Sequence, residues 1–375
     1  PSAAPPNPRV RMSRLRLTLG RLALATFSLL LALGAVELLA RHRVGTENAW
    51  MLLNTPNWYD NSIFQADTEL MQVLAPGAVG RFSTPEFTTT VRISSQGLRE
   101  DELPSKPPGE RRVLAVGDSF TLAVQVEQDQ SFQALLEEQL GPTVRVLNAG
   151  VDGYGTGQAA RYAARLAPVV QPDALLLTFF LGNDFSDNQG FRPGTYPHER
   201  PNLPPLLSPA DRRWGWSAIY MHTRAWQKSR DPSLAPALGH QRAQVGLFAQ
   251  GADLNPFLGP TRQALDELAA VAARLQIPLI VAIAPPAFAI DEARTASALE
   301  MVGLPGSADP GGPARALQPL LPAGALSLDL APVLAEAEQG GRTYFIFDGH
   351  WSRRGHRAVA QALAPLIEQA LASPR

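Results

Sequence analysis

Four short motifs place the residue types that acyl transfer requires in a fixed order along the chain. The first contains Ser119, whose hydroxyl can attack a carbonyl carbon. The last contains His350, which can take the serine's proton, and Asp348, which can hold the imidazole in the required tautomer. The motifs are GDSF (117–120), NAGVDGYGT (148–156), GND (182–184) and DGHW (348–351). Together they predict a serine nucleophile with a histidine base.

Acyl transfer also needs hydrogen-bond donors around the oxygen that becomes negatively charged in the transition state. Each such donor contributes roughly 10²–10³ in rate. The motifs supply three candidate donors, which are the backbone N–H groups of Ser119 and Gly153 and the side-chain amide of Asn183. We expect these groups to form an oxyanion hole.

Alternating strands and helices are predicted from residue 112 onwards, and they have to position these motifs. Apolar runs predict strands at 112–117, 144–149, 174–182, 277–284 and 326–330. Helical patterns fall near 127–140, 156–168, 260–275, 289–301 and 352–372. Strands separated by single helices are typical of a parallel sheet with helices on both faces. The carboxyl ends of such strands share one edge, so motifs that follow the strands can meet there.

Each candidate also has a purely structural interpretation. Ser119 can be a helix N-cap, Asn183 a turn former and His350 a buried structural histidine. We assign Asp184 to structure and Asp118 to a hydrogen bond with the local backbone. The ordered set of motifs favours the catalytic interpretation for the first three.

Three further features receive no catalytic role. His356 is the rival base, but it is expected on the last helix, pointing away from the site. Arg99, in SSQGLRED, has no assigned role. The glycine cluster at 153–160 begins too late after its strand for a dinucleotide motif. His350 and His356 are six apart, which does not fit a helical zinc site, so we expect neither cofactor nor metal.

The ordered motifs resemble the SGNH, or GDSL-type, hydrolase family, whose four blocks contribute Ser, Gly, Asn and His in this order. The resemblance covers about residues 110–372. It implies an α/β fold, a flavodoxin-like three-layer sandwich with a central parallel sheet of about five strands. The roles that it implies are nucleophile for Ser119, oxyanion hole for Gly153 and Asn183, base for His350 and partner of the base for Asp348.

One departure from the family pattern concerns the last motif. Most members place two residues between the aspartate and the histidine, whereas only Gly349 lies between Asp348 and His350. The shorter D-x-H-W form resembles the SGNH-like O-acetyltransferases that modify exported polysaccharides, including alginate. Gly349 can permit the altered turn. A different carboxylate remains an alternative partner for His350.

The amino-terminal region predicts a membrane anchor. Five arginines between residues 9 and 21 precede an apolar run, 22–40, that only Glu37 interrupts. Counted as 17–40, the run is long enough to cross a hydrocarbon core of roughly 30 Å. Residues 1–16 are expected to be a disordered basic segment on the cytoplasmic side. A cleaved signal peptide and a soluble helix are the alternatives.

This anchor places the rest of the chain outside the cytoplasm, which for a bacterial inner membrane means the periplasm or the cell exterior. Residues 41–108 are expected to be an extension with short strands, such as TTTVRIS, that ends at the hinge PSKPPGE. Residues 109–375 are expected to form the hydrolase domain. A Pro-rich insertion at about 186–259 is either a lid or a peripheral subdomain, and its notable aromatic residues are Trp214, Trp216, Tyr220 and Trp226.

Composition limits the remaining function classes. The formal net charge of −1 gives no electrostatic reason to expect a nucleic-acid partner, and the absence of cysteine excludes disulfides and thiolate metal sites.

From the four motifs and the apolar amino-terminal run, we expect a membrane-anchored serine esterase. Its substrate would be an acyl ester, which a saccharide can carry. An O-acyltransferase with a sugar hydroxyl as acceptor is the alternative, and a non-catalytic scaffold with the same fold is the second.

Overall fold

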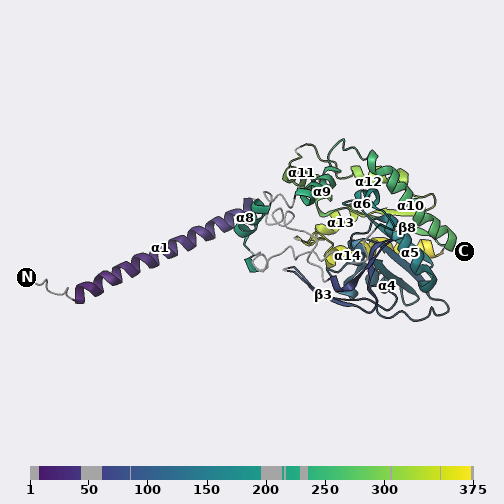
Figure 1. Cartoon of the computed structure of the whole chain (residues 1–375), viewed down its shortest axis with the longest axis horizontal. Coiled ribbons are helices and arrows are strands. Elements are labelled where there is room, and N and C mark those ends of the chain that lie inside the picture. Colours follow the sequence, from purple (N-terminus) through teal and green to yellow (C-terminus); the bar gives the residue numbers. More distant parts are fainter. Residues whose placement is uncertain are drawn as a thin grey trace, which may run out of the picture. The chain divides into compact units, whose positions relative to one another are not determined.

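The computed structural model (Figure 1) divides into two compact units, which are described separately. The first comprises residues 1–53 and 209–230, and the second comprises residues 54–208 and 231–375. The residues that the structure describes are 8–43, 61–84, 86–195, 213–214, 217–228, 235–304, 306–346 and 348–372.

The first unit contains the long helix α1 (Pro8–Arg43). Its segment Arg16–Ala40 has 25 residues and contains an 18-residue window with a mean hydropathy of 2.2 and no burial, so it is long and apolar enough to cross a membrane. Residues 1–7 lie outside the described residues. Residues 8–16, which we expected to be disordered, are helical instead. Arginine and leucine are good helix formers and extend a helix that the apolar segment already stabilises.

The carboxylate of Glu37 in α1 caps a second helix of this unit, α8 (Ala218–Lys228). It accepts hydrogen bonds from the Ser217 hydroxyl at 2.9 Å and from the N–H groups of Ala218 at 2.7 Å and Ile219 at 3.1 Å. The carboxylate thus provides an acceptor for first-turn N–H groups that have no partner within the helix. The one acidic residue of the apolar run therefore has a defined structural partner.

The second unit is built on a five-stranded parallel sheet with the order β6-β5-β7-β8-β9. The strands are β5 (Arg111–Gly117), β6 (Val144–Gly150), β7 (Ala174–Phe180), β8 (Leu279–Ala284) and β9 (Leu326–Asp329). The expected parallel sheet of about five strands with flanking helices is confirmed.

The sheet separates two hydrophobic cores, and alternate residues of β5 enter different ones. Leu114 and Val116 belong to the core beneath α5 and α10. Val113 and Ala115 belong to the core beneath α4 and α14. Burial of both faces explains why β5 reads as a continuous apolar run instead of an alternating one.

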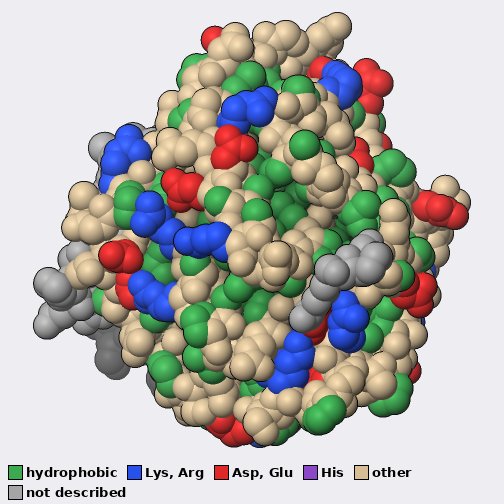
Figure 2. Space-filling model, turned by 90° about the vertical axis from the view of Figure 1, so that its right-hand side faces the viewer, with side chains coloured by type: hydrophobic (Ala, Val, Ile, Leu, Met, Phe, Trp, Pro, Cys, Tyr) green, Lys and Arg blue, Asp and Glu red, His purple; other side chains and the backbone are tan. Residues whose placement is uncertain are grey.

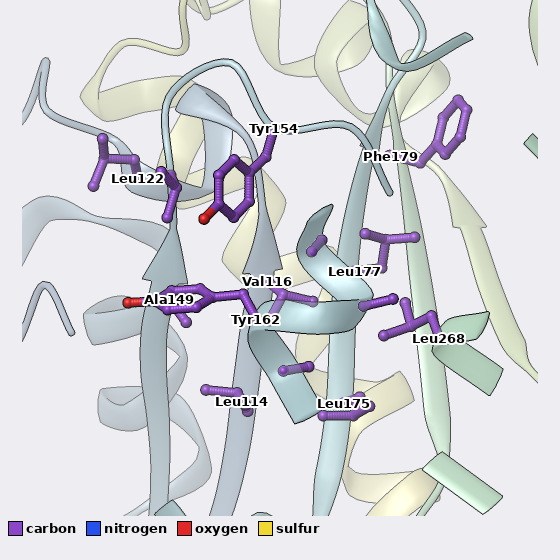
Figure 3. Close-up of a cluster of buried hydrophobic side chains, with 14 of the residues drawn as sticks. Leu114, Val116, Leu122, Ala149, Tyr154, Tyr162, Leu175, Leu177, Phe179 and Leu268 are labelled. Atoms are coloured by element: carbon purple, nitrogen blue, oxygen red, sulfur yellow. The ribbon is translucent and has the colours of Figure 1, made fainter. Parts of the chain in front are cut away.

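Figure 3 shows part of the first of these cores. Leu114 and Val116 from β5, Leu175 and Leu177 from β7 and Leu268 from α10 are drawn together there, and all five are fully buried. Burying a leucine side chain completely contributes about 1.5–3 kcal/mol. This packing fixes the position of the strand ends that carry the motifs.

Among its described residues, the second unit has the five expected helices and five that were not expected. They are α3 (Ser119–Leu122), α4 (Phe132–Leu140), α5 (Thr156–Val170), α6 (Asp184–Gly190), α9 (Ala235–Gly246), α10 (Asn255–Leu275), α11 (Glu292–Met301), α12 (Gly312–Leu317), α13 (Ala331–Glu338) and α14 (Arg353–Ala372). The helix expected from residue 127 starts at 132. Its N-cap is Ser131, whose hydroxyl accepts the Ala134 N–H, and a 3₁₀ turn at Gln128–Gln130 precedes it.

Two antiparallel hairpins precede the sheet within the same unit. They consist of β1 (Phe64–Asp67), β2 (Met71–Leu74), β3 (Val79–Ser83) and β4 (Thr88–Arg92). The strand expected within TTTVRIS corresponds to β4. Gln72 Nε2 donates to the Asp152 carbonyl at 2.6 Å, and the Tyr154 hydroxyl donates to the Gln72 carbonyl at 2.5 Å. The first hairpin is therefore bonded directly to the loop after β6.

The aromatic insertion is only partly described. Trp214 is about half exposed, and the Arg213 guanidinium lies 5.7 Å from its ring centre. Trp216 and the side chain of Trp226 lie outside the described residues. The interpretation of the insertion as a lid stays a prediction.

Basic and acidic side chains are interspersed on the face of the molecule shown in Figure 2. This distribution agrees with the formal net charge of −1. On that face no broad basic region is visible among the described residues.

Candidate active site

The turn after β5 presents Ser119 and uses its neighbours to do so. Gly117 has φ 150°, and a Cβ there would lie 2.4 Å from Thr121 Oγ1 and 2.9 Å from the Thr178 carbonyl oxygen. Asp118 is the N-cap of α3, because its Oδ1 accepts the N–H of Phe120 at 2.9 Å. Ser119 is therefore not needed as the cap, and its hydroxyl is available for another partner.

The loop before α14 brings His350 to this hydroxyl. His350 Nε2 lies 2.7 Å from Ser119 Oγ, and its Nδ1 lies 2.6 Å from Asp348 Oδ1. Gly349 has φ 81°, and the loop closes through a hydrogen bond from the Phe345 N–H to the His350 carbonyl. One intervening residue is thus enough for Asp348 to reach the imidazole of His350.

These contacts define the protonation pattern that a general base needs. Asp348 accepts the proton of Nδ1, which leaves the lone pair of Nε2 facing the Ser119 hydroxyl. The Phe120 ring lies 4.6 Å from the His350 ring and 5.0 Å from the Trp351 ring, measured between centroids. This aromatic packing restricts rotation of the imidazole.

Carboxylates offset the effect of burial on His350. Burial lowers its pKa, but Asp348, through its charge and hydrogen bond, and the charges of Asp118 and Asp152 raise it, and the net shift is upward. A raised pKa means that the protonated imidazole is stabilised. That is the form produced when the serine's proton is taken.

Burial raises the pKa of several carboxyl groups near this site. Burial, with repulsion from Asp152, raises the pKa of Asp118 to about 7, although the Phe120 N–H and His350 oppose the rise. Burial and repulsion from Asp118 also raise the pKa of Asp187 to about 7 and that of Asp184 well above its usual range.

The other predicted site residues lie beyond the neighbouring strand ends. Gly117 is in register with Gly150 of β6 and with Thr178 of β7. Gly153 and Asn183 follow these strands, and Asn183 is the N-cap of α6. Both residues therefore come from the sheet edge where β5 delivers Ser119. Their roles in an oxyanion hole stay a prediction.

A cavity of about 700 Å³ in this unit includes Gly153 in its wall. Its lining also contains polar side chains, among them Gln158, Asp187 and Gln244, and the aromatic rings of Phe191 and Phe257. Its volume falls in the range of small-molecule sites. Part of a molecule bound near Gly153 can therefore extend into a cavity lined by both polar and aromatic side chains.

His356, the rival base, is a structural histidine. It is 1% exposed, and its Nδ1 accepts the Phe132 N–H at 3.3 Å. Burial, with contributions from Arg99 and His350, lowers its pKa to about 3. The expectation that it points away from the site agrees with this position in the core.

Arg99, which had no assigned role, holds the segment that follows Ser119. Its guanidinium donates to the carbonyls of Leu122 at 2.7 Å and of Ala123 and Val126 at 2.5 Å each. The side chain is 1% exposed, and burial lowers its pKa to about 10. Ala123 has a left-handed φ of 60°, so Arg99 stabilises a turn that the local sequence does not favour.

The comparison with family models matches the carboxyl-terminal part of the chain. Residues 248–374 match the family model described as an SGNH hydrolase-like domain, acetyltransferase AlgX. This part of the chain is therefore similar to SGNH hydrolase-like domains. The matched segment contains Asp348 and His350, whereas Ser119, Gly153 and Asn183 lie before it.

Solved structures of esterases and of a lipase/acylhydrolase are similar to this chain at low identity. A carbohydrate acetylesterase family member from Sinorhizobium meliloti is 14% identical, with a TM-score of 0.37, over 70% of this chain and 100% of that one. The acetyl xylan esterase AlAXEase is 11% identical, with a TM-score of 0.37, over 68% of this chain and 99% of that one. A lipase/acylhydrolase from Enterococcus faecalis is 12% identical, with a TM-score of 0.35, over 69% of this chain and 96% of that one. The comparison with curated proteins gave no significant match.

Proposed function

We propose that this SGNH-type protein is a membrane-anchored serine esterase that forms an acyl-enzyme on Ser119. The observation that carries the proposal is the hydrogen-bonded series of Ser119 Oγ, the His350 imidazole and Asp348 Oδ1, with distances of 2.7 and 2.6 Å. A nucleophile in contact with a base, which is oriented in turn by a carboxylate, is the arrangement that activates a serine.

In the first half-reaction, Ser119 Oγ attacks the ester carbonyl while its proton passes to His350 Nε2. The N–H groups of Ser119 and Gly153 and the amide of Asn183 would bind the resulting oxyanion. The intermediate collapses by breaking the bond to the alcohol oxygen, which takes the proton from His350. Ser119 then carries the acyl group as an ester.

In the second half-reaction, water attacks the acyl-enzyme, and His350 takes the proton of the water. Collapse of the second tetrahedral intermediate releases the carboxylic acid and returns the proton to Ser119 Oγ. Asp348 stabilises the imidazolium in both halves without being protonated. No cofactor is needed for this sequence.

The anchor supports a location at the bacterial inner membrane. The apolar segment Arg16–Ala40 is about 37 Å long at 1.5 Å per residue, which exceeds a hydrocarbon core of roughly 30 Å. Arginines cluster on its amino-terminal side, which favours a cytoplasmic start and a catalytic domain in the periplasm or outside the cell.

An O-acyltransferase is the second candidate, because the matching family model is that of an acetyltransferase. The acyl-enzyme would be the same, and a sugar hydroxyl would replace water as the attacking group. The cavity beside Gly153, with its glutamine side chains and aromatic rings, offers polar and stacking contacts for a saccharide.

The decisive experiment uses the purified full chain in detergent. A fluorophosphonate probe should label the wild type at Ser119, and Ser119→Ala should abolish labelling, whereas Ser62→Ala, which changes an exposed serine, should not. Undiminished labelling of Ser119→Ala would remove the assignment, and no labelling of the wild type would favour the scaffold.

A second assay separates the two enzymatic candidates. The protein is incubated with an aryl acetate, with and without oligosaccharide acceptors. Free acetate as the main product supports the esterase. Acetylated sugar as the main product would establish the transferase instead.

A further inference from the structure

The side chain of Glu86, in the turn between β3 and β4, reaches the loop that carries the base. Its Oε1 accepts the N–H of Ile346 at 2.7 Å, and its Oε2 accepts the N–H of Asp348 at 2.9 Å. The bonded residues are 260 and 262 positions apart in the chain. Hydrogen bonds to an ionised acceptor are stronger than neutral ones, and two of them fix the loop backbone in direction as well as position.

The turn that presents Glu86 is itself held in place. Thr84 Oγ1 accepts the N–H groups of Glu86 and Phe87, each at 3.1 Å, and the Thr84 N–H donates to the Phe87 carbonyl at 2.8 Å. The Phe87 ring packs against Phe345 of the base loop, with 5.2 Å between centroids. An apolar contact therefore accompanies the two polar ones.

Strand β4, which follows this turn, forms hydrogen bonds with the segment that follows Ser119. Thr89 Oγ1 donates to the Val124 carbonyl at 2.6 Å, and the Thr90 N–H donates to Glu127 Oε1 at 3.2 Å. These partners lie just after the α3 turn that begins with Ser119. One hairpin thus bonds both to the nucleophile segment and to the base loop.

We propose that Glu86 is a positioning residue that holds the base loop so that Asp348 remains against His350. The inference rests on the proposed function, since it concerns the same Ser119–His350–Asp348 site. Glu86 acts through the backbone of the loop and does not touch the substrate. The supporting residue of the site thus comes from the amino-terminal extension instead of from the hydrolase motifs.

Two substitutions at this position separate geometry from charge. Glu86→Gln replaces one of the two acceptor oxygens by a donor, so one loop N–H loses its partner. Glu86→Asp keeps the negative charge but shortens the side chain by one methylene, so that it cannot bridge both N–H groups. The matched control is Glu102→Gln, whose parent carboxylate accepts the N–H and O–H of Ser95 within the extension, at 2.8 and 2.6 Å.

The first readout is hydrolysis of an aryl acetate by the full chain, normalised to active sites titrated with fluorophosphonate. Both Glu86 variants should lower kcat roughly 10- to 100-fold, the loss expected when catalytic groups shift by about 1 Å, with KM changed less than about twofold. Glu102→Gln should match the wild type. A kcat within about twofold of the wild type for both Glu86 variants would overturn the proposal.

The second readout is the pH profile. Asp348, Asp118 and Asp152 raise the pKa of His350 against the effect of burial. Moving Asp348 away weakens its contribution, so the acidic limb of kcat/KM should shift to lower pH in both Glu86 variants. Simple loss of folded protein would reduce the titrated sites without moving the limb. A shift in Glu86→Gln alone would mean that charge, not position, is responsible, which would also overturn the proposal.

A third measurement does not depend on catalysis. Histidine-labelled full chain carrying Ser119→Ala is titrated by NMR, and the His350 signal is assigned by its loss in His350→Gln. The pKa of His350 should fall when Glu86→Gln or Glu86→Asp is added and stay unchanged with Glu102→Gln. If the wild type neither labels nor hydrolyses esters, the proposed function fails, while this titration still decides the role of Glu86.

Discussion

Asp348 Oδ1 lies 2.6 Å from His350 Nδ1 although only Gly349 separates the two residues in sequence. The positive φ of Gly349, 81°, lets the backbone turn back within one residue, and the His350 N–H also donates to Asp348 Oδ1 at 3.2 Å. The carboxylate therefore meets both the backbone and the imidazole of its partner. A single intervening residue is therefore sufficient for this contact between the carboxylate and the imidazole.

Asp348→Asn should lower kcat by roughly 10³–10⁴-fold, because an amide neither fixes the required tautomer of His350 nor stabilises its cation. The acidic limb of kcat/KM should also move to lower pH. The charge that raises the pKa of His350 is lost, so the imidazole stays unprotonated in more acidic solution. Aryl acetate hydrolysis between about pH 5 and 9 measures both effects.

The control for this substitution is Asp329→Asn, which changes a carboxylate that accepts the Ala331 N–H at the start of α13. Circular dichroism should show the same fold for both variants. Activity of Asp348→Asn close to the wild type would mean that another group orients His350, the alternative that the shortened motif leaves open.

Arg99→Met should destabilise the protein and misplace the nucleophile. The Leu122, Ala123 and Val126 carbonyls would each lose a charged donor in a buried setting, at a cost of about 1.5–3 kcal/mol for one such bond. We expect a lower midpoint in denaturant and slower fluorophosphonate labelling. Arg92→Met, at an exposed position of β4, is the matched control, and equal labelling rates in the two variants would contradict the role of Arg99.

The sequence predicted the parts of the molecule whose signals are local. β5 and β6 lie within one residue of the expected ranges, because strands buried on both faces form unbroken apolar runs. The helix expected from 127 starts later because Ser131 offers a better cap. In each case the deciding signal lies within a few residues of the element.

Contacts between distant segments could not be predicted in the same way. Glu86 stands in TPEFTTT, where nothing marks it as a partner of a loop some 260 residues away. Arg99 lies in the motif SSQGLRED, but its role depends on the three backbone carbonyls that it binds after Ser119. A pattern of side chains does not show where backbone carbonyls lie. Such backbone-directed contacts become visible only when the tertiary arrangement is known.

Gly117→Ala should prevent correct formation of the nucleophile turn. The added Cβ would lie 2.4 Å from Thr121 Oγ1 and 2.9 Å from the Thr178 carbonyl oxygen, and the latter is backbone of a central strand that cannot yield. Gly77→Ala is the matched control, since Gly77 also has positive φ, 72°, but nothing lies within 4 Å of the added atom. It should cost only about 1–2 kcal/mol from backbone strain.

Thermal unfolding and fluorophosphonate labelling compare these two glycine variants. Gly117→Ala should lose most of the labelling and unfold at a clearly lower temperature than Gly77→Ala. Equal losses in the two variants would show that backbone strain alone, and not the crowding around Gly117, accounts for the effect.

His356→Gln should change how stability depends on pH. In the folded state the pKa of His356 is lowered to about 3, whereas in the unfolded chain it is near its ordinary value of 6.5. Between these values the unfolded state binds the extra proton, so this residue makes the protein less stable as pH falls from about 6.5 towards 3. The slope is about 1.4 kcal/mol per pH unit.

Glutamine at 356 keeps an acceptor for the Phe132 N–H but does not titrate. The wild type should therefore lose its stability advantage over the variant as the solution is acidified below about pH 6.5, and the difference should be constant above that value. Denaturant unfolding of both proteins at a series of pH values measures the difference directly, because the titration of the buried aspartates is common to both proteins and cancels. A difference that does not change with pH would mean that the pKa of His356 is the same in the folded core as in the unfolded chain.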